Sequence, residues 1–278
     1  METVFNHVVT NLELKEKHQL DFPFLDYGYL YGYGLFESIK IINGRPILLE
    51  EHIQRMKKGA IILDIPFLWG IDNVKNKAIE LIQKNEISKG ILNFYLTPGN
   101  RSYDPAVTHI KDPFFLMVNR EWPNYPDDFS ATLELRQESF QKTQLDRLKT
   151  LSWMKNVLEN RLNKDTDDVL LYNERHEILE TTRANVYFIK DNVIHTPKSP
   201  VILPGIVRQF VINNQEKLGY KVIERSITSD ELADFDEIFL SNALRGIFFV
   251  NKILRFEGLE SKDVATQIKK RFNEILDI

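Results

Sequence analysis

The 278-residue chain contains no cysteine, so disulfide bonds, thiolate metal ligands and cysteine nucleophiles are excluded. Long apolar runs are also missing: stretches such as Phe114–Val118 and Ile247–Val250 fall far short of the roughly 18 residues that span a bilayer. Runs of lysine and arginine are short, and the formal net charge is −4. Because dense positive charge largely holds nucleic acid and anionic lipid, neither nucleic acid nor a membrane is expected as a partner.

The composition is that of a folded globular protein, with 43% hydrophobic and 27% charged residues. At roughly 150 residues per domain, the length suggests two folded units. We expect an interdomain linker at residues 119–130, where prolines and acidic residues follow an apolar run. The linker separates a smaller N-terminal unit, 1–118, from a larger C-terminal unit, 131–278. The N-terminus lacks the basic start and apolar stretch of a signal peptide, which favours a cytoplasmic protein.

Hydrophobic periodicity predicts mixed strands and helices, an α/β or α+β architecture. Two strands are expected on either side of Asn43-Gly44, a dipeptide that favours a tight hairpin turn, and a helix is expected over 49–63. In the second unit the spacing predicts a helix over 206–218 that ends at Gly219. A further helix is expected over 150–163, with an apolar face that lies on a core and consists of Leu151, Met154, Leu158 and Leu162.

Several common catalytic motifs are absent. The sequence has no Gly-x-x-x-x-Gly-Lys-[Ser/Thr] phosphate loop, no His-Glu-x-x-His metal helix and no Gly-x-Ser-x-Gly nucleophile turn. Its six histidines are scattered, without a pair at the spacing that metal ligands have on a helix. No catalytic metal is therefore expected.

One lysine stands at a predicted boundary between elements. Lys149 precedes the expected 150–163 helix by one residue, where its side chain can face a cavity while the helix packs behind it. Partial loss of solvent there favours the neutral amine that forms a Schiff base. A solvated lysine at a helix start has the same spacing, so both interpretations remain open.

Three further features suit an anion or a cofactor. Gly205 precedes the 206–218 helix, and the free backbone N–H groups of Ile206 and Val207 suit a phosphate group, although such a turn often binds nothing. Arg55 offers a cation for the same phosphate or belongs to a solvated helix face. Glu180 interrupts two strand-like runs, either as a functional carboxylate or as a turn residue.

Five blocks in a fixed order resemble a known family: YGLFESIKIINGRPILLEEHIQRM, LKTLSWMKNVL, ILETTRANVYF, ILPGIVRQ and FLSNALRGIFFV. Their order and spacing are similar to those of the class IV aminotransferases, the fold-type IV pyridoxal 5'-phosphate (PLP) enzymes. The resemblance implies a two-domain fold like that of D-amino-acid aminotransferase, with PLP in the cleft between the domains. It also implies an amino substrate and, in most members, a homodimer.

The resemblance assigns roles to individual residues. Lys149 matches the lysine that forms the internal aldimine with PLP and later moves the substrate proton. Glu180 matches the carboxylate that pairs with the pyridine nitrogen, where a negative charge keeps the nitrogen protonated and the ring serves as an electron sink. Arg55 matches the arginine that binds the cofactor phosphate.

The remaining cofactor contacts are assigned in the same way. Ile206 and Val207 match the backbone donors at the helix start. The turn Ser241-Asn242-Ala243 matches the loop that completes the phosphate cup. Tyr31 resembles an active-site tyrosine of the N-terminal domain that lines the substrate side.

Three activities share this scaffold, and the turn discriminates between them. Lyases often carry Asn-Ala-Leu in this turn, and this chain has Asn242-Ala243-Leu244 there. Ser38 stands where lyases have a threonine hydroxyl that assists proton transfer. We therefore expect a PLP-dependent 4-amino-4-deoxychorismate lyase that releases pyruvate and 4-aminobenzoate. The alternative is a class IV aminotransferase that acts on branched-chain L-amino acids or D-amino acids with 2-oxoglutarate. A non-catalytic PLP-binding or interaction protein is an alternative of another class.

Two positions depart from the family pattern. Trp153 stands where many members have a tyrosine that contacts the cofactor; its indole N–H can donate a hydrogen bond but does not titrate. Asn93 stands where an arginine is frequent. Arg101 or Arg245 is therefore expected to bind the substrate carboxylate in its place.

Overall fold

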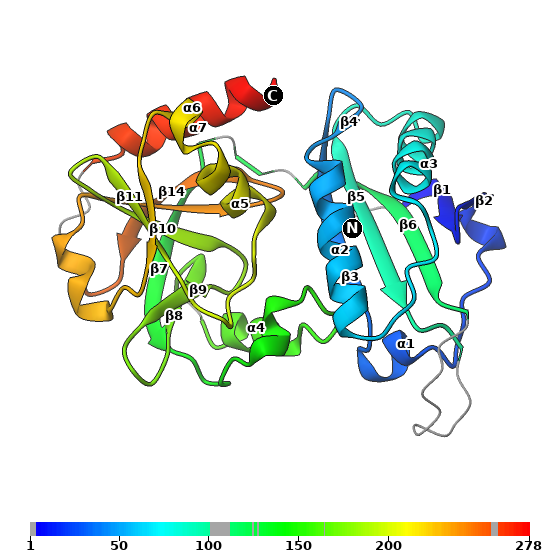
Figure 1. Ribbon diagram of the computed structural model, residues 1–278, viewed down its shortest axis with the longest axis horizontal. Coiled ribbons are helices and arrows are strands. Elements are labelled where there is room, and N and C mark those ends of the chain that lie inside the picture. Colours follow the sequence, from blue (N-terminus) through cyan, green and yellow to red (C-terminus); the bar gives the residue numbers. More distant parts are fainter. Residues whose placement is uncertain (1–3, 101–111, 124, 127, 164, 257–260) are drawn as a thin grey trace. The chain divides into compact units, whose positions relative to one another are not determined.

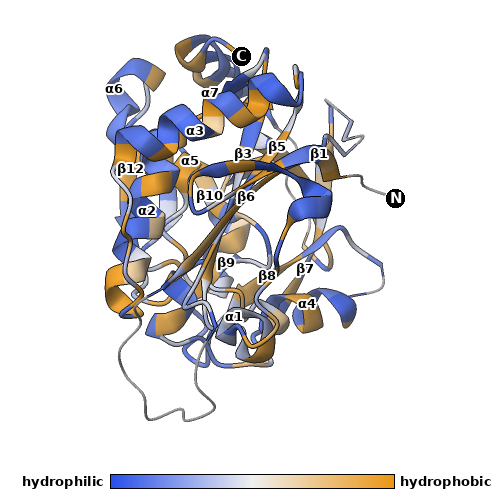
Figure 2. Cartoon of the chain, turned by 90° about the vertical axis from the view of Figure 1, so that its right-hand side faces the viewer, coloured by the Kyte–Doolittle hydropathy of each residue, from blue (hydrophilic) through white to orange (hydrophobic). Residues whose placement is uncertain are grey.

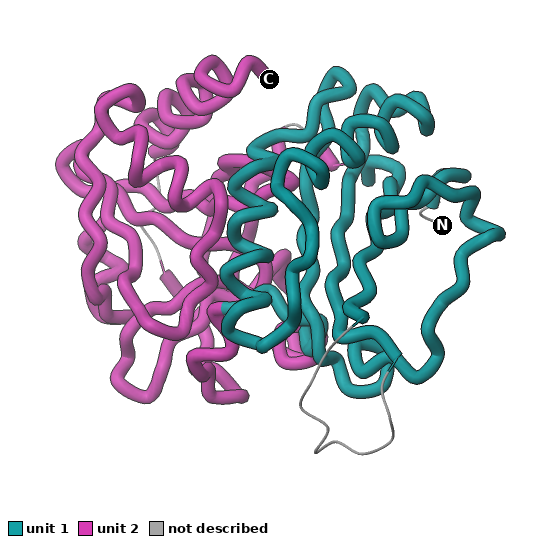
Figure 3. The backbone as a smooth tube through the Cα atoms, turned by 45° about the vertical axis from the view of Figure 1, so that its right-hand side comes forward, with its two compact units in different colours: residues 1–124, 148–153 teal, residues 125–147, 154–278 magenta. Residues whose placement is uncertain are grey.

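The computed structural model describes residues 4–100, 112–123, 125–126, 128–163, 165–256 and 261–278 (Figure 1). The chain divides into two compact units (Figure 3). Unit 1 comprises residues 1–124 and 148–153, and unit 2 comprises residues 125–147 and 154–278. None of the described helices combines the length and the hydrophobicity that a membrane span requires.

Unit 1 contains a six-stranded sheet in which every neighbouring pair is antiparallel. Its order is β2-β1-β6-β5-β3-β4, and its strands are β1 (Val4–Thr10), β2 (Glu13–Glu16), β3 (Leu35–Ile42), β4 (Arg45–Pro46), β5 (Gly90–Thr97) and β6 (Phe114–Glu121). The turn between β3 and β4 has positive φ at Asn43 and Gly44, 51° and 71°, as a tight hairpin turn requires. The predicted hairpin is confirmed.

The core of unit 1 lies between this sheet and two helices, α2 (Leu49–Ile62) and α3 (Ile71–Lys84). Along β3 every second side chain is buried, which places Leu35, Ile39 and Ile41 on the helix-covered face. Helix α2 runs alongside β3 (Figure 1) and buries Ile53, Met56 and Ala60 in the same core. The predicted 49–63 helix is thus confirmed. The shorter elements of unit 1 are η1 (Lys17–Gln19) and α1 (Tyr27–Tyr31).

Unit 2 contains an eight-stranded mixed sheet of order β12-β11-β10-β13-β14-β7-β8-β9. Its strands are β7 (Ser130–Gln137), β8 (Asp168–Tyr172), β9 (Ile178–Thr181), β10 (Asn185–Lys190), β11 (Val193–Pro197), β12 (Val222–Arg225), β13 (Glu237–Asn242) and β14 (Gly246–Ile253). The pairs β11–β12, β14–β7 and β7–β8 are parallel. This mixture of strands and helices in two units confirms the predicted fold class.

Unit 2 has a hydrophobic core on each face of its sheet, because alternate residues of a strand point in opposite directions. Val186 and Phe188 of β10 belong to one cluster, and Tyr187 and Ile189 belong to the other. The second cluster includes side chains of α5 (Ile206–Asn213), α6 (Gln215–Leu218) and α7 (Asp263–Leu276). These helices carry hydrophilic and hydrophobic patches in Figure 2. The remaining elements are η2 (Gln144–Arg147), α4 (Met154–Arg161) and η3 (Ser229–Asp234).

The 206–218 helix forms as two successive helices, α5 and α6, and ends at Gly219, whose φ is 75°. The prediction for 150–163 was wrong in its start and in its buried face. Helix α4 begins at Met154, and Met154 and Leu162 are 68% and 59% exposed. Glu159 is buried instead, because its carboxylate accepts hydrogen bonds from Ser139 N at 2.5 Å and Ser139 Oγ at 3.1 Å. A satisfied polar contact has overridden the apolar periodicity.

The first crossing between the units falls within the expected 119–130 linker, but the chain crosses between the units twice more. Strand β6 continues to Glu121 and pairs there with Gly90 of β5. The first crossing falls after residue 124, and residues 148–153 then return to unit 1. This return has no compositional signal, because it depends on backbone pairing with a distant strand.

Candidate active site

Lys149 lies in an extended segment, not at a helix start as its sequence position predicted. The segment pairs with the beginning of β3: Phe36 N donates to Lys149 O at 2.9 Å, and Leu151 N donates to Gly34 O at 2.9 Å. Thr150 faces Leu35 in an isolated antiparallel bridge. These bonds attach the lysine to the sheet of unit 1.

Two aromatic rings surround the Lys149 amine. Its Nζ atom lies 4.3 Å from the centre of the Phe36 ring and 4.6 Å from the centre of the Trp153 ring. The two rings meet edge to face, with centres 5.5 Å apart. An ammonium group over an aromatic face is attracted by the negative face of the ring. The position of Lys149 is thus set by backbone pairing and by contacts of its side chain.

A buried cluster of Glu37, His52 and Arg55 lies in the same unit. Glu37, on the inward face of β3, accepts hydrogen bonds from Arg55 Nε at 2.7 Å and Arg55 Nη2 at 2.5 Å. The second carboxylate oxygen also lies 2.6 Å from His52 Nδ1. Such a two-pronged contact fixes the plane of a guanidinium group. The structure therefore places the predicted phosphate-binding arginine in a rigid pair.

The charges of this cluster shift two pKa values. Burial raises the pKa of Glu37, but the Arg55 guanidinium, His52 and their hydrogen bonds outweigh it and lower the pKa to about 2. Burial lowers the pKa of His52, against the effect of Glu37, and the positive charges of Arg55 and Lys149 lower it further. At neutral pH the cluster is therefore an ionised Glu37–Arg55 pair hydrogen-bonded to a neutral imidazole.

The Glu37 shift predicts an acid-dependent loss of stability. A folded-state pKa near 2, below the ordinary 4.5, stabilises the fold above pH 4.5, and this contribution is lost as the pH falls from 4.5 through 2. The shift corresponds to about 3 kcal/mol of unfolding free energy. Denaturant unfolding measures the free energy of unfolding of the wild type and of Glu37→Gln. The difference between the two is expected to be largest at pH 6 and to shrink progressively toward pH 3. A difference that is constant with pH would contradict this.

Glu180, the predicted partner of the pyridine nitrogen, lies in β9 of unit 2 and is 5% exposed. Its carboxylate accepts hydrogen bonds from Asn185 Nδ2 at 3.0 Å and from Leu203 N at 3.2 and 3.3 Å. It also forms an ion pair with Lys142, whose side chain is 6% exposed. Glu180 is a buried, well-held carboxylate, and the turn-residue interpretation is wrong.

Asn185 links this carboxylate to the segment that leads into α5. Its Nδ2 donates both to Glu180 and, at 3.1 Å, to Leu203 O. Gly205 is the N-cap and has no side chain to accept from the first turn. The backbone N–H groups of the first helical turn lack partners within the helix, and Ile206 and Val207 stand there. The first turn of α5 therefore presents backbone N–H groups a few residues after Leu203, whose own N–H binds Glu180.

Gly205 is required by a close approach. A Cβ atom at this position would lie 2.0 Å from Asn185 Oδ1, and Asn185 is itself held by Glu180 and Leu203. We expect Gly205→Ala to cost about 1–3 kcal/mol of unfolding free energy through overpacking, measured by denaturant unfolding. Gly70→Ala is the matched control, since Gly70 also caps a helix but its Cβ would meet Asn73 at 3.6 Å, an ordinary contact. Equal losses for both variants would show that the Asn185 contact has no effect.

The turn after β13 begins beside Asn185, because Ser241 of β13 pairs with Asn185 of β10 in the sheet. The Ser241 hydroxyl is buried and lies 2.8 Å from Tyr187 Oη. Asn242 closes the turn, because its Oδ1 accepts from Leu244 N at 3.2 Å and Arg245 N at 2.8 Å. Both side chains have structural contacts, so the predicted phosphate loop of Ser241, Asn242 and Ala243 offers mainly its backbone.

The predicted substrate-side residues are divided between the two units. In unit 1, Ser38 Oγ accepts from Asn93 Nδ2 at 2.8 Å, and the Tyr31 ring is 67% exposed and packs edge to face on Tyr27. In unit 2, the Arg245 guanidinium lies 4.0 Å from the Tyr125 ring centre and 3.9 Å from that of Phe129. Burial lowers the pKa of Arg245. Arg101 lies outside the described residues.

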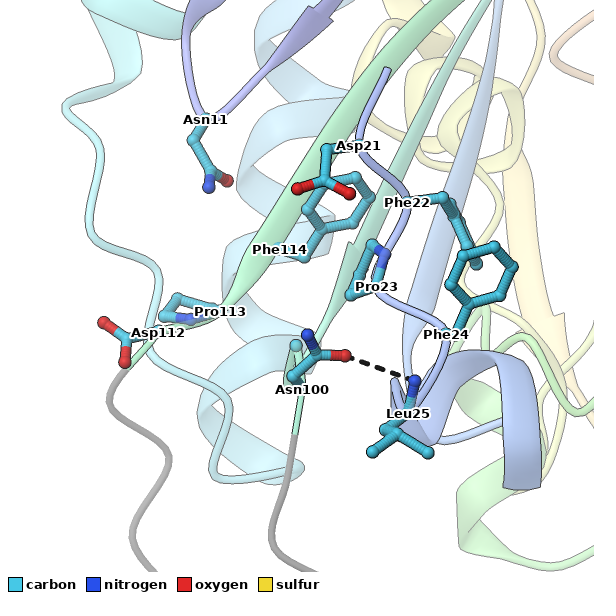
Figure 4. Close-up of a pocket in the computed structure, with 11 residues that line it drawn as sticks. Asn11, Asp21, Phe22, Pro23, Phe24, Leu25, Asn100, Asp112, Pro113 and Phe114 are labelled. Atoms are coloured by element: carbon cyan, nitrogen blue, oxygen red, sulfur yellow. Dashed lines mark hydrogen bonds between the residues drawn. The ribbon is translucent and has the colours of Figure 1, made fainter. Parts of the chain in front are cut away.

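Unit 1 also contains a pocket of about 510 Å³ (Figure 4). Leu25 N donates to Asn100 Oδ1 at 3.2 Å at its edge. None of the predicted site residues lines it; the lining residues are Asn11, Asp21, Phe22, Pro23, Phe24, Leu25, Gly99, Asn100, Asp112, Pro113 and Phe114. The pocket is therefore separate from the residues around Lys149.

Sequence reasoning missed several residues that the structure adds. Glu37 carries a readable signal, because it is a charged residue among the apolar side chains that share the buried face of β3. His52 carries another, since it lies on the buried stripe of α2, three residues before Arg55. Lys142 and Asn185 have no local signal, because only the folded chain brings them to Glu180.

Comparison with known proteins identifies the family. The family model of class IV amino-transferases matches residues 34–253 of this chain. The D-alanine aminotransferase of Bacillus licheniformis is 27% identical over 253 residues, which cover 88% of each chain.

Solved structures are similar along nearly the whole chain. A protein from Legionella pneumophila subsp. pneumophila str. Philadelphia 1, provisionally named 4-amino-4-deoxychorismate lyase, is 25% identical with a TM-score of 0.85, over 93% of this chain and 96% of that one. The branched-chain amino acid aminotransferase from Escherichia coli is 19% identical with a TM-score of 0.87, over 98% and 94% of the two chains, which shows the shared fold. Since the family model covers most of the sequence, the chain belongs to the class IV amino-transferase family of PLP-dependent aminotransferases and lyases.

Proposed function

We propose that this chain is a PLP-dependent aminotransferase that moves the amino group of a small amino acid, with D-alanine as the first donor to test, to 2-oxoglutarate. The observation that carries this choice is the similarity to the Bacillus licheniformis D-alanine aminotransferase along 88% of both chains. It favours the transferase over the lyase expected from the turn sequence. We further propose a homodimer as the working form, to be measured by light scattering.

The donor set of the described residues fits PLP. The cofactor presents a phosphate dianion, a pyridine nitrogen and an aldehyde, each of which needs a different partner. The uncapped N-terminus of α5 suits the phosphate, the Glu180 carboxylate suits the pyridine nitrogen, and the Lys149 amine suits the aldehyde. Arg55, in its rigid pair with Glu37, is proposed as a further donor to the phosphate.

PLP, when bound, supplies an electron sink for the carbanion that amino-group transfer requires. Lys149 Nζ is proposed to remove the proton from the substrate α-carbon, because a positioned amine serves as a general base. Phe36 and Trp153 shield this amine from water on two sides. Glu180 would keep a proton on the pyridine nitrogen by accepting its hydrogen bond.

The lyase remains the second candidate because of one specific feature, the turn Asn242-Ala243-Leu244, whose Asn242 side chain closes the loop. The provisionally named lyase from Legionella pneumophila is 25% identical to this chain. The two functions differ in their products. The lyase forms pyruvate and 4-aminobenzoate from aminodeoxychorismate without an amino acceptor, whereas the transferase needs a 2-oxo acid.

One experiment separates these functions. Purified protein is loaded with PLP, and its visible spectrum is recorded with D-alanine, L-leucine and aminodeoxychorismate in turn. The proposed function predicts that D-alanine converts the bound cofactor to its amine form and that 2-oxoglutarate restores the starting spectrum. Pyruvate and 4-aminobenzoate from aminodeoxychorismate, without an acceptor, would support the lyase. A spectrum unchanged by every amine would support a non-catalytic PLP-binding or interaction protein.

A further inference from the structure

Unit 2 contains a buried lysine that the proposed chemistry does not use. Lys142 follows β7, and its side chain is only 6% exposed. Its Nζ atom donates to Glu180 Oε1, and its backbone N–H donates to Glu138 Oε2 at 3.0 Å. A lysine is almost never fully buried unless it is paired. The burial of Lys142 therefore depends on Glu180, and that of Glu180 depends on Lys142.

The carboxylate of Glu180 has a defined number of acceptor positions. An ionised carboxylate offers about four, and three donors are present: Lys142 on Oε1, Asn185 on Oε2, and Leu203 N shared between the two oxygens. These donors come from β10 and from two separate connecting segments of unit 2. They prevent rotation of the carboxylate and leave one acceptor position for a further N–H donor.

We propose that Lys142 is a positioning residue that acts through Glu180, an inference that rests on the function proposed above. The ammonium group compensates the buried carboxylate charge and holds Oε1, so that the remaining acceptor position is directed at the pyridine nitrogen of PLP. Without this cation, the buried carboxylate charge loses its compensation and Oε1 keeps only its share of the Leu203 N–H. The carboxylate then responds by rotating or by taking up a proton, and either change withdraws the acceptor from the cofactor.

The test compares PLP binding by Lys142→Met, which keeps the length of the side chain and removes its charge, with binding by the wild type. A hydrogen bond to a charged group is strong enough that we expect the dissociation constant for PLP to rise about tenfold or more. The visible absorbance maximum of the bound cofactor is expected to shift, because protonation of its ring changes. Lys142→Arg restores a cation and is expected to recover most of the affinity.

A double-variant comparison distinguishes positioning from a purely structural role. In the Glu180→Gln background, Lys142→Met is expected to change PLP affinity less than about twofold, because the group through which it acts is gone. Lys155→Met is the matched control, since Lys155 forms an ion pair with Asp146 in the same unit without touching Glu180. If Lys142→Met fails to fold, Lys142→Gln, which retains a donor, serves in its place.

The outcomes separate this inference from the proposed function. If the wild type binds no PLP, the proposed function fails and the role of Lys142 fails with it. If the wild type binds PLP and Lys142→Met binds it with equal affinity and an unchanged spectrum, only the role of Lys142 is overturned. The same result follows if Lys142→Met weakens binding equally with and without Glu180.

Discussion

Replacing Lys149 with alanine is expected to abolish amino-group transfer, with a fall in turnover of about 10⁴-fold or more. Lys149 is the amine held between Phe36 and Trp153, and a positioned proton-transfer group alone contributes up to about 10⁴-fold. The variant is expected to fold, because the segment is attached to β3 through its backbone. The measurement is the rate of pyruvate formation from D-alanine and 2-oxoglutarate.

A covalent readout accompanies the kinetic one. Borohydride reduction of the PLP-loaded wild type, followed by peptide mapping, is expected to label residue 149. Lys58→Ala is the matched control, because Lys58 is an exposed lysine of α2 in the same unit. Label on another lysine, or a Lys149→Ala variant with wild-type turnover, would refute the assignment.

Replacing Glu37 with alanine is expected to lower the free energy of unfolding by about 3–5 kcal/mol at pH 7, because it removes the carboxylate from a buried ion pair with Arg55. Glu37 is 1% exposed, and both of its oxygens are engaged by Arg55, with His52 on the second oxygen. Denaturant unfolding with a two-state fit measures this loss. PLP affinity is expected to fall as well, since Glu37 orients the proposed phosphate donor.

The control for this variant is another glutamate of the same helix–strand layer. Glu50→Ala removes an ion pair between Glu50 and Lys75 whose side chains are 55% and 34% exposed. Exposed pairs contribute about 0–1 kcal/mol, so the two variants are expected to differ by several kcal/mol. A loss below about 1 kcal/mol for Glu37→Ala would show that the cluster relaxes when the carboxylate is removed.

Local patterns predicted the elements whose burial follows from their own periodicity. The β3–β4 hairpin, helix α2 and the α5–α6 segment were all placed correctly, since each depends on neighbouring residues such as Asn43, Gly44 and Gly219. The helix expected over 150–163 failed because its buried face is decided by Ser139, which is distant in sequence and donates hydrogen bonds to the buried Glu159.

In the candidate site, too, local sequence indicated some residues and missed the distant contacts around them. Lys149, Glu180 and the α5 N-terminus were proposed as site residues from ordered sequence blocks and a turn signal. Their surroundings were not found, because Lys142 reaches Glu180 across 38 positions of the chain and the Lys149 segment pairs with β3 across a still longer separation. Such contacts depend on topology, which spacing within one segment cannot reveal.

The return of residues 148–153 to unit 1 has a consequence for protein synthesis. Gly34, at the start of β3, leaves the ribosome long before Leu151, whose backbone N–H it binds, has been translated. Unit 1 thus stays incomplete until part of the following unit has been translated, and a truncated product ending near residue 124 lacks Lys149 altogether. With Lys149 as the proposed attachment point, loading of the vitamin-derived aldehyde has to wait until translation has passed the middle of the chain.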